Sequence, residues 1–305
     1  MKPTPLSAPR SGVWAAVGAV CLVGGSVAAS DRLHGYPLLG GQAVRFTLAT
    51  LFLLVWARLR RHTFTRPTRT DLLWITLLAA LGMAGYGVVL IRATSATAPG
   101  NIGIAIGAAP LVIVLIRAAV TGTRPSRALT GGALCVAAGS AVAQLAGAQG
   151  VEPSPGGLLW ACLALVGVVS VTLLGAPPIR DLGALTVTTY ACALASAMLL
   201  TAALLTRAVT GNPVLRLPTA GEFTALAFLA LGVTTVVFLL WYAAVERLGP
   251  SRAGLFNGLV PFASLLALFL TGAGTATRYQ LAGAALVLCG VVVSLRPAAG
   301  APSAR

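Results

Sequence analysis

Charged residues are scarce in this chain. Only 9% of its 305 residues are charged, whereas a typical soluble domain carries about 25%. Apolar residues make up 57% of the chain, and the mean hydropathy is +0.92. A soluble fold cannot hide so much apolar surface from water. The composition therefore predicts a protein whose solvent is the lipid bilayer.

Acidic residues are rarer still, and none falls in the middle of an apolar run. The six of them are Asp31, Asp71, Glu152, Asp181, Glu222 and Glu246. A carboxylate that carries protons through a membrane is normally buried within a span. The sequence offers no candidate for such a carrier.

Signatures of metal, cofactor and catalytic sites are also missing. The chain has two histidines and five cysteines, and the cysteines form no Cys-x-x-Cys pair. It contains no phosphate-binding loop, no His-Glu-x-x-His helix and no Gly-x-Ser-x-Gly elbow. We therefore expect no metal, no cofactor and no catalytic residue, and we interpret the cysteines as small packing residues.

Ten apolar runs follow one another along the chain. A helix needs about 20 mostly apolar residues to cross the hydrocarbon core, and each run is close to that length. Arg45 is the one charged residue inside any of them. We predict an all-α membrane protein with ten transmembrane helices. The runs are Gly12–Ala29, Tyr36–Ala57, Leu72–Ile91, Ala98–Ile116, Leu129–Leu145, Gly156–Gly175, Leu182–Leu205, Phe223–Tyr242, Ala253–Thr271 and Tyr279–Leu295.

Positive charge alternates between the two sides of these runs. The net charge is +15, which in a soluble protein would suggest nucleic-acid binding. With the N-terminus in the cytoplasm, 15 of the 21 Lys and Arg residues fall on the cytoplasmic side and five on the other. Because positive residues gather in cytoplasmic loops, we expect both termini in the cytoplasm and no nucleic-acid partner.

The two halves of the chain repeat a pattern of proline and glycine. An offset of 151 residues pairs Pro99 with Pro250, Gly103 with Gly254, Gly107 with Gly258, Pro110 with Pro261, Gly132 with Gly283 and Gly139 with Gly290. With five spans in each half, the second half is inverted relative to the first. Inverted repeats are typical of secondary transporters, which bind substrate between the repeats. We predict repeats over residues 12–147 and 148–296, with cytoplasmic tails at 1–11 and 297–305.

Taken together, these features resemble the EamA-like branch of the drug/metabolite transporter superfamily. The residues that carry the resemblance are Leu39–Phe46 (LGGQAVRF), Thr94–Pro110 (TSATAPGNIGIAIGAAP), Ala243–Pro261 (AAVERLGPSRAGLFNGLVP) and Leu281–Val293 (LAGAALVLCGVVV). The resemblance covers nearly the whole chain and implies ten spans in two inverted repeats. The family often has a Gly-Glu pair after the fourth and ninth spans, where this chain has Gly122-Thr123 and Gly272-Ala273.

Arg45 is the most unusual residue within a span. A charge at the centre of a helix costs about 2.5–3.5 kcal/mol on insertion scales, so we expect Arg45 to face the bundle interior and to have a partner. Either it binds a carboxylate or phosphate of a substrate in a central cavity, or it is a structural tie to backbone carbonyls at a helix end, with its side chain snorkelling toward the membrane surface. The resemblance favours the structural role, because the family often has Arg here whatever the substrate.

Other candidates for a substrate cavity are uncharged. They are Tyr86, Asn101, Asn257, Trp14 and Trp160, and Gln42, Gln144 and Tyr190 are further polar possibilities. Amides inside spans more often hydrogen-bond a neighbouring helix. For tryptophan and tyrosine near span ends, the alternative is an aromatic belt at the lipid headgroups. The belt interpretation covers Trp14, Trp56, Trp74, Trp160, Trp241, Tyr36, Tyr242 and Tyr279.

The repeated proline and glycine residues have a separate interpretation. Gly-x-x-x-Gly pairs let helices approach closely, and a proline three residues later removes a backbone hydrogen bond and favours a kink. We predict tight packing at these positions, with a hinge role compatible with it. They are Gly103, Gly107, Pro110, Gly254, Gly258 and Pro261.

The resemblance implies a secondary transporter in the cytoplasmic membrane of a prokaryote that exports a small polar metabolite such as an amino acid. Without a buried carboxylate, we expect transport that is facilitative or coupled through the protonation of the substrate itself. The expected partners are that substrate and the bilayer, and the chain is expected to be a monomer or a homodimer. The alternatives are a lipid-linked flippase or an accessory membrane subunit, with a lateral groove open to lipid, and a membrane enzyme, which the missing catalytic signatures disfavour.

Overall fold

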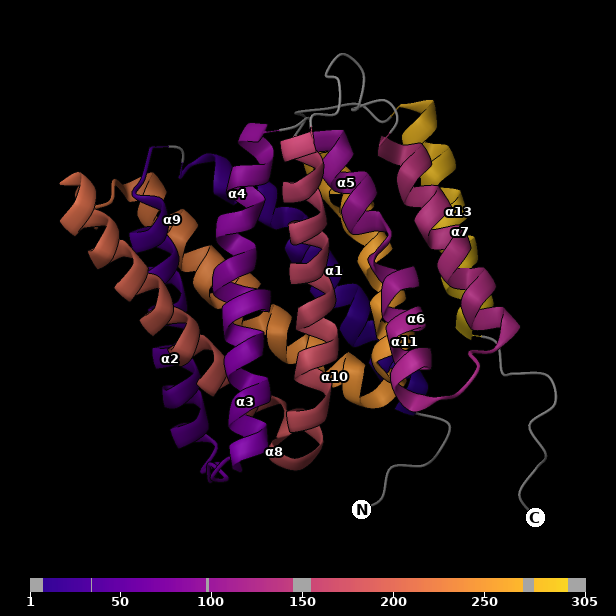
Figure 1. Ribbon diagram of the computed structural model, residues 1–305, viewed down its shortest axis with the longest axis horizontal. Coiled ribbons are helices and arrows are strands. Elements are labelled where there is room, and N and C mark those ends of the chain that lie inside the picture. The colour runs from indigo at the N-terminus through magenta and orange to yellow at the C-terminus, as the bar shows by residue number, and fades with distance from the viewer. Residues whose placement is uncertain (1–7, 34, 97–98, 145–154, 271–276, 296–305) are drawn as a thin grey trace.

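The computed structural model describes residues 8–33, 35–96, 99–144, 155–270 and 277–295 (Figure 1). Every regular element among these residues is helical. Six stretches in this part of the chain are long and apolar enough to cross a membrane: Leu38–Leu59, Arg69–Val89, Ile102–Thr121, Pro155–Thr210, Ala220–Leu248 and Arg278–Leu295. The all-helical class is confirmed, whereas the count of ten spans stays a prediction.

The helices before residue 145 are α1 (Ala8–Asp31), α2 (Leu38–Leu59), α3 (Arg69–Leu77), the π-helical η1 (Leu78–Gly85), α4 (Tyr86–Ala96), α5 (Pro99–Gly107), α6 (Ala109–Thr121) and α7 (Arg127–Gln144). Those after residue 154 are α8 (Pro155–Thr210), α9 (Ala220–Phe228), the π-helical η2 (Leu229–Val236), α10 (Val237–Leu248), α11 (Pro250–Leu255), the 3-10 helix η3 (Phe256–Leu259), α12 (Val260–Leu270) and α13 (Arg278–Leu295). The segments α3, η1 and α4 follow one another without a gap, as do α9, η2 and α10.

Helix α8 consists of two helices joined by a sharp turn at Gly183. The φ of 79° and ψ of 159° at this residue are not helical, and residues with a Cβ atom rarely adopt such a positive φ. The chain reverses at this turn, at the lower end of the bundle in Figure 1. Helix α8 therefore contains both of the apolar runs predicted between Gly156 and Leu205.

Two further features recur at the offset of the proline and glycine pattern. Helix α3 begins with a capping box between Thr68 and Asp71, and α9 begins with one between Thr219 and Glu222. These boxes lie 151 residues apart, and so do the first residues of the two π-helical segments. Because π-helical turns are rare inside α-helices, their recurrence at this offset supports a duplicated fold.

Helices α7 and α13 pack side by side and run in opposite directions (Figure 1). A Cβ atom added to Gly132 would lie 2.6 Å from the carbonyl oxygen of Gly290, and one added to Gly139 would lie 2.7 Å from that of Gly283. Only glycine permits so close an approach of two backbones. Exchanging the two halves at the 151-residue offset converts each of these contacts into the other, so an approximate twofold axis runs between the two helices.

Connections that carry many of the arginines lie at one end of the bundle. In Figure 1 the connections from α2 to α3, from α6 to α7 and from α10 to α11, and the turn within α8, all lie at the lower end. Helix α1 begins and α13 ends there too. This arrangement agrees with the alternation of charge along the sequence. Which end faces the cytoplasm stays a prediction.

The outer surface of the bundle carries many large apolar side chains. Large side chains such as Val120, Leu205 and Phe269 are 77%, 63% and 65% exposed. In water such a surface would favour aggregation, whereas lipid tails solvate it as well as a neighbouring helix would. The structure is therefore that of a multi-pass membrane protein.

Candidate functional site

Arg45 lies on α2 and directs its guanidinium group toward η2. Its Nε donates a hydrogen bond of 2.6 Å to Oγ1 of Thr234, and its Nη1 donates a longer one of 3.5 Å to Oε1 of Gln42. The guanidinium carbon lies 5.6 Å from the centre of the Phe46 ring, which is within cation–π range. The side chain thus joins two helices that are far apart in the sequence.

The π-helical turn of η2 explains why Thr234 can accept this bond. The Thr234 hydroxyl donates its own hydrogen to the carbonyl oxygen of Leu229, five residues earlier, at 2.9 Å. Thr235 bonds Ala230 in the same way at 3.0 Å. The hydrogen of Thr234 is therefore used, and its oxygen still has lone pairs for Arg45.

No carboxylate neutralises Arg45 among the described residues. Its hydrogen-bond partners are a hydroxyl and an amide, and the titratable side chains that lie near it are those of Tyr86 and Cys192. The arginine side chain is only partly buried. An intramembrane cation is costly unless it is paired or lines a polar cavity. This position is therefore suited to receive an anionic group.

Tyr86 and Trp160 belong to one small hydrophobic cluster, which also contains Ala93. Tyr86 is the first residue of α4, and its ring lies against Gly167 of α8. A Cβ atom added to Gly167 would lie 2.6 Å from Cδ2 of the tyrosine. The structure thus places two of the predicted cavity residues, Tyr86 and Trp160, in one cluster, and Tyr86 also lies near Arg45.

The other three predicted cavity residues are Asn257, Asn101 and Trp14. Asn257 lies in η3, and its Nδ2 is buried without a hydrogen-bond partner. Asn101 lies in α5, but its side chain is outside the described part of the structure. Trp14 is 73% exposed on the outer surface of α1. That position suits the aromatic belt, and we leave Trp14 out of the proposed site.

The repeated glycines lie where helices approach most closely. Gly107 and Gly258 both face α7, and a Cβ atom added to Gly107 would lie 2.5 Å from Cβ of Ser140. In the same sense Gly103 faces Gln144, Gly254 faces Ile113 and Gly258 faces Val136. Each contact would have to yield before a larger residue could be accommodated.

The two repeated prolines follow breaks in their helices. Helix α5 ends at Gly107, and α6 starts at Ala109, one residue before Pro110. In the second half α11 gives way to η3, which ends two residues before Pro261. Whether these breaks serve as hinges stays a prediction.

The belt interpretation is wrong for Trp241 and Tyr242. They are 5% and 0% exposed, because α10 continues beyond them to Leu248 and keeps them inside the bundle. Trp241 Nε1, the Tyr242 hydroxyl and Thr172 Oγ1 are all buried without a hydrogen-bond partner. The sequence singled out neither Thr172 nor Cys192.

Two connecting segments each reach across to the other half of the chain. In the segment between α8 and α9, Arg216 pairs with Glu222, and its backbone carbonyl accepts a hydrogen bond of 2.9 Å from the Tyr36 hydroxyl. The bond to the carboxylate raises the pKa of the Arg216 guanidinium. In the segment between α2 and α3, the Nε2 atom of His62 lies 3.0 Å from Oγ1 of Thr186 on α8.

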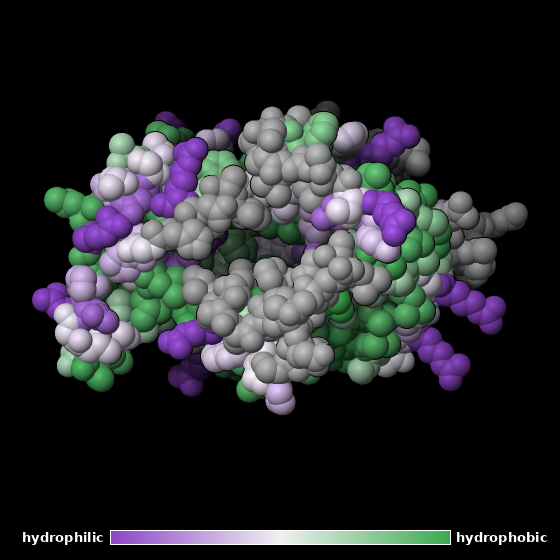
Figure 2. Space-filling model, turned by 90° about the horizontal axis from the view of Figure 1, so that it is seen from above, coloured by the Kyte–Doolittle hydropathy of each residue, from purple (hydrophilic) through white to green (hydrophobic). Residues whose placement is uncertain are grey.

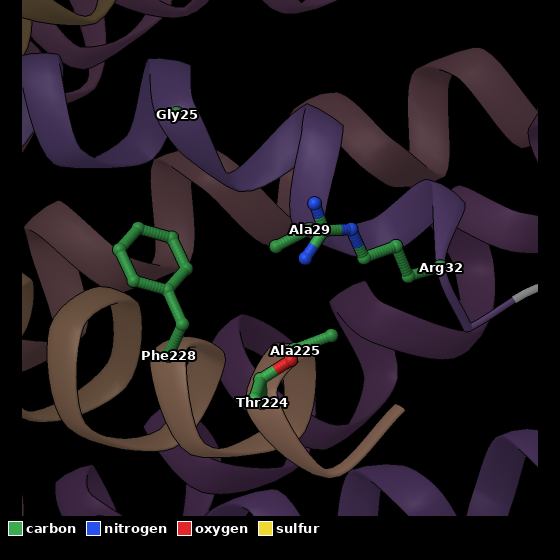
Figure 3. Close-up of a pocket in the computed structure, with 6 residues that line it drawn as sticks. All are labelled: Gly25, Ala29, Arg32, Thr224, Ala225 and Phe228. Carbon is green, nitrogen blue, oxygen red and sulfur yellow. The ribbon is translucent and has the colours of Figure 1, made fainter. Parts of the chain in front are cut away.

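The bundle has a central hollow and two grooves on its flank. Seen from above, its face is hollowed near the middle (Figure 2). One groove, of about 350 Å³, lies between α1 and α9, and Figure 3 shows the Arg32 side chain extending over it toward Ala29. A second groove, of about 450 Å³, lies between α2 and α9 and is lined by apolar residues such as Val44, Leu48 and Phe223. Neither groove includes Arg45.

Comparison with known proteins gives consistent matches. The model of the EamA-like transporter family matches residues 10–144 and again residues 155–296. The "Uncharacterized transporter YyaM" of Bacillus subtilis (strain 168) is 24% identical over 266 residues, which cover 83% of this chain and 82% of that protein. The "Probable terminal-alkyne amino-acid exporter" of Streptantibioticus cattleyicolor is 29% identical over 270 residues, which cover 88% and 87%. A solved crystal structure superimposes with a TM-score of 0.78 at 22% identity, over 96% of this chain and 97% of that one.

Proposed function

Because the chain belongs to the EamA-like transporter family, we propose that it exports a small polar metabolite across the cytoplasmic membrane by alternating access. The family and the names of the relatives identify a transporter and not an enzyme. The substrate class that we propose is an amino acid or a related zwitterion, which agrees with the printed name of one relative. Transport is facilitative or coupled through the protonation of the substrate.

Ten membrane spans in two inverted repeats form the framework of this proposal. The family model matches the chain twice, which supports the two units over residues 12–147 and 148–296. The antiparallel contact between α7 and α13 and the capping boxes at a constant offset support their inversion. Two related halves can exchange conformations, and this exchange would open the site first to one side of the membrane and then to the other.

The observation that carries the substrate class is the uncompensated charge of Arg45. Its Nε bond to Thr234 fixes the side chain between α2 and η2. Nη2 makes no hydrogen bond to any described residue, so it remains free for a substrate carboxylate. The structural role and the substrate role predicted for Arg45 are therefore compatible in one geometry. Tyr86 lies near Arg45 and belongs with Trp160 to one hydrophobic cluster, and we propose that this cluster receives the side chain of the substrate.

The first experiment measures uptake into proteoliposomes. The probe is L-propargylglycine, a terminal-alkyne amino acid, and it is compared with 4-pentynoate, which lacks the ammonium group, and with propargylglycine amide, which lacks the carboxylate. We expect uptake of the amino acid, slower uptake of the acid and none of the amide. If none of these compounds and no metabolite in a mixed pool enters faster than into protein-free liposomes, the proposal is wrong.

Variants of Arg45 test its role directly. Charge-assisted hydrogen bonds contribute about 1.5–3 kcal/mol, so Arg45→Gln should lower uptake of the amino acid by about 10- to 100-fold. Arg45→Lys should recover only part of the loss, because lysine lacks the planar fork. Thr234→Val is the matched control, since it removes the tie to η2 and keeps the charge. If Thr234→Val loses as much uptake as Arg45→Gln, Arg45 serves only as a structural tie.

A lipid-linked flippase is the alternative function that a specific observation favours. The two grooves beside α9 lie on the flank of the bundle, and one of them carries Arg32 over a partly apolar surface. A scrambling assay with fluorescent phospholipids in liposomes separates the two functions. Movement of labelled lipid together with no uptake of amino acids would favour the flippase.

A further inference from the structure

Thr172 and Tyr242 carry hydroxyl groups that are fully buried and have no hydrogen-bond partner. Burying a hydroxyl without a partner destabilises a folded protein. Membrane proteins place most of their polar side chains where these find one another or line a polar path. Two unpartnered hydroxyls near one helix contact therefore indicate that they have partners in another conformation.

The Tyr242 hydroxyl lies at the contact between α10 and the first half of α8. The ring of Tyr242 packs against Gly175, where an added Cβ atom would lie 2.7 Å from Cε1 and 3.0 Å from the hydroxyl oxygen. Thr172 precedes Gly175 by three residues and so lies on the same face of α8. Among the described residues, Tyr242 is thus held by shape and not by a hydrogen bond through its hydroxyl.

Cys192 connects this contact to Arg45. It is fully buried in the second half of α8, in the same hydrophobic core cluster as Tyr242, and it lies near Arg45. A helix rises by about 1.5 Å per residue, so Gly175 and Cys192 each lie about 12–14 Å from the turn at Gly183. The contact between Tyr86 and Gly167 lies about 24 Å from that turn on the same basis. Tyr242 therefore lies between the Tyr86 contact and the end of the bundle where α8 turns.

The first half of α8 is built to bend close to this contact. Pro177 and Pro178 follow Gly175 directly in the next turn. Neither residue can donate a backbone hydrogen bond, so the helix is weakened there. A small change of direction at these prolines would move Gly175 away from Tyr242.

We propose that Thr172, Cys192 and Tyr242 line the half of the substrate path that leads from Arg45 to the end where α8 turns. Tyr242, packed on Gly175, closes this half in the present structure, while the opposite face is the one hollowed in Figure 2. When α10 and the first half of α8 separate, the two hydroxyls bind the polar groups of a small zwitterion. The inference rests on the proposed function for its substrate.

The test uses Cys192 as a reporter and needs no substrate, so its failure would leave the uptake result untouched. In a variant whose other four cysteines are replaced by alanine, the reaction of Cys192 with N-ethylmaleimide is followed by mass spectrometry in proteoliposomes. Gly175→Ala inserts a methyl group into the Tyr242 contact, and overpacking disfavours the closed arrangement. We expect labelling to become about tenfold faster. Gly156→Ala, on the same helix but with no atom within 4 Å of the added Cβ, should leave the rate unchanged.

Two further variants separate opening of the path from general loosening. Ala133→Cys, in the cysteine-free background, reports from a fully buried position on α7. If Gly175→Ala accelerates the labelling of Cys192 and of this reporter equally, the proposal is overturned. It is also overturned if the labelling of Cys192 does not become faster. Tyr242→Phe keeps the ring on Gly175 and removes the unpartnered hydroxyl, so labelling should slow and thermal stability should rise. Faster labelling with lower stability would mean that the Tyr242 hydroxyl has a structural partner, and the proposal would fail. This result does not depend on whether Gly175→Ala folds.

Discussion

Helix α7 offers a direct test of how the two halves meet, because it carries two adjacent glycines with opposite surroundings. An alanine Cβ at Gly132 would lie 2.6 Å from the Gly290 carbonyl oxygen and 2.8 Å from Cβ of Ser294. A Cβ added at Gly131 would have no neighbouring atom within 4 Å. Either substitution should gain about 0.8–1.0 kcal/mol of helix propensity. Only Gly132→Ala forces two backbones apart, at a cost of about 1–3 kcal/mol. The free energies of unfolding of the two variants should therefore differ by about 1–3 kcal/mol.

The measurement is unfolding in mixed micelles of mild detergent and dodecyl sulfate, followed by circular dichroism. Gly283→Ala should resemble Gly132→Ala, because its Cβ would lie 2.5 Å from the Gly139 carbonyl oxygen. The free energy of unfolding of the double variant Gly132→Ala/Gly290→Ala should fall by less than the sum of the losses in the two single variants, because one separation of the helices relieves both clashes. Equal stability of Gly131→Ala and Gly132→Ala would refute the packing described for α7 and α13.

The remaining predictions concern the helix caps and the topology. Thr68→Ala and Thr219→Ala each remove an N-cap side chain and should each lower the free energy of unfolding by about 1 kcal/mol; a loss confined to one of them would contradict the equivalence of the two caps. A reporter fused after Arg305, or inserted within Arg58–Arg69, should read cytoplasmic, and one within Gly147–Pro155 should read external, because 15 of the 21 basic residues lie on the cytoplasmic side of the ten-span arrangement. Termini on opposite sides of the membrane would exclude that arrangement.

The class of the fold could be read from hydropathy because lipid imposes the same requirement on every span. A helix that crosses the bilayer needs about 20 predominantly apolar residues, so the signal is strong along the whole chain. The glycine register was also readable, since Gly132 and Gly283 recur at one offset. The sequence did not show that these glycines face the other half of the chain, because spacing along a sequence does not identify the opposing helix.

Some structural features have a sequence signature that hydropathy does not indicate. Thr68 with Asp71 and Thr219 with Glu222 have the spacing of capping boxes, and they lie at the offset of the repeat. The burial of Tyr242 was missed for a different reason. Charged residues at Glu246 and Arg247 lowered the local hydropathy, so the expected span ended at Tyr242, whereas α10 continues to Leu248.

The partner of Arg45 could not have been predicted from local pattern. Thr234 lies 189 residues away, and its hydroxyl oxygen is presented by a π-helical turn that carries no recognisable sequence signature. The proximity of Cys192 to Arg45 and to Tyr242 likewise depends on how three helices pack. Interactions of this kind are fixed by tertiary structure, which is why the sequence identified Arg45 as unusual but left its role open.

The distribution of close backbone contacts divides the bundle into parts with different capacities to move. Between α7 and α13 two pairs of glycines place backbone directly against backbone, so these helices can slide or separate only by losing the whole contact. In contrast, α5 with α6 and α11 with α12 are each interrupted in mid-helix, where fewer hydrogen bonds resist bending. Alternating access needs a fixed element shared by both halves and moving elements around it. On the proposed mechanism, the α7–α13 pair is the fixed element, and the interrupted helices and the first half of α8 move around it.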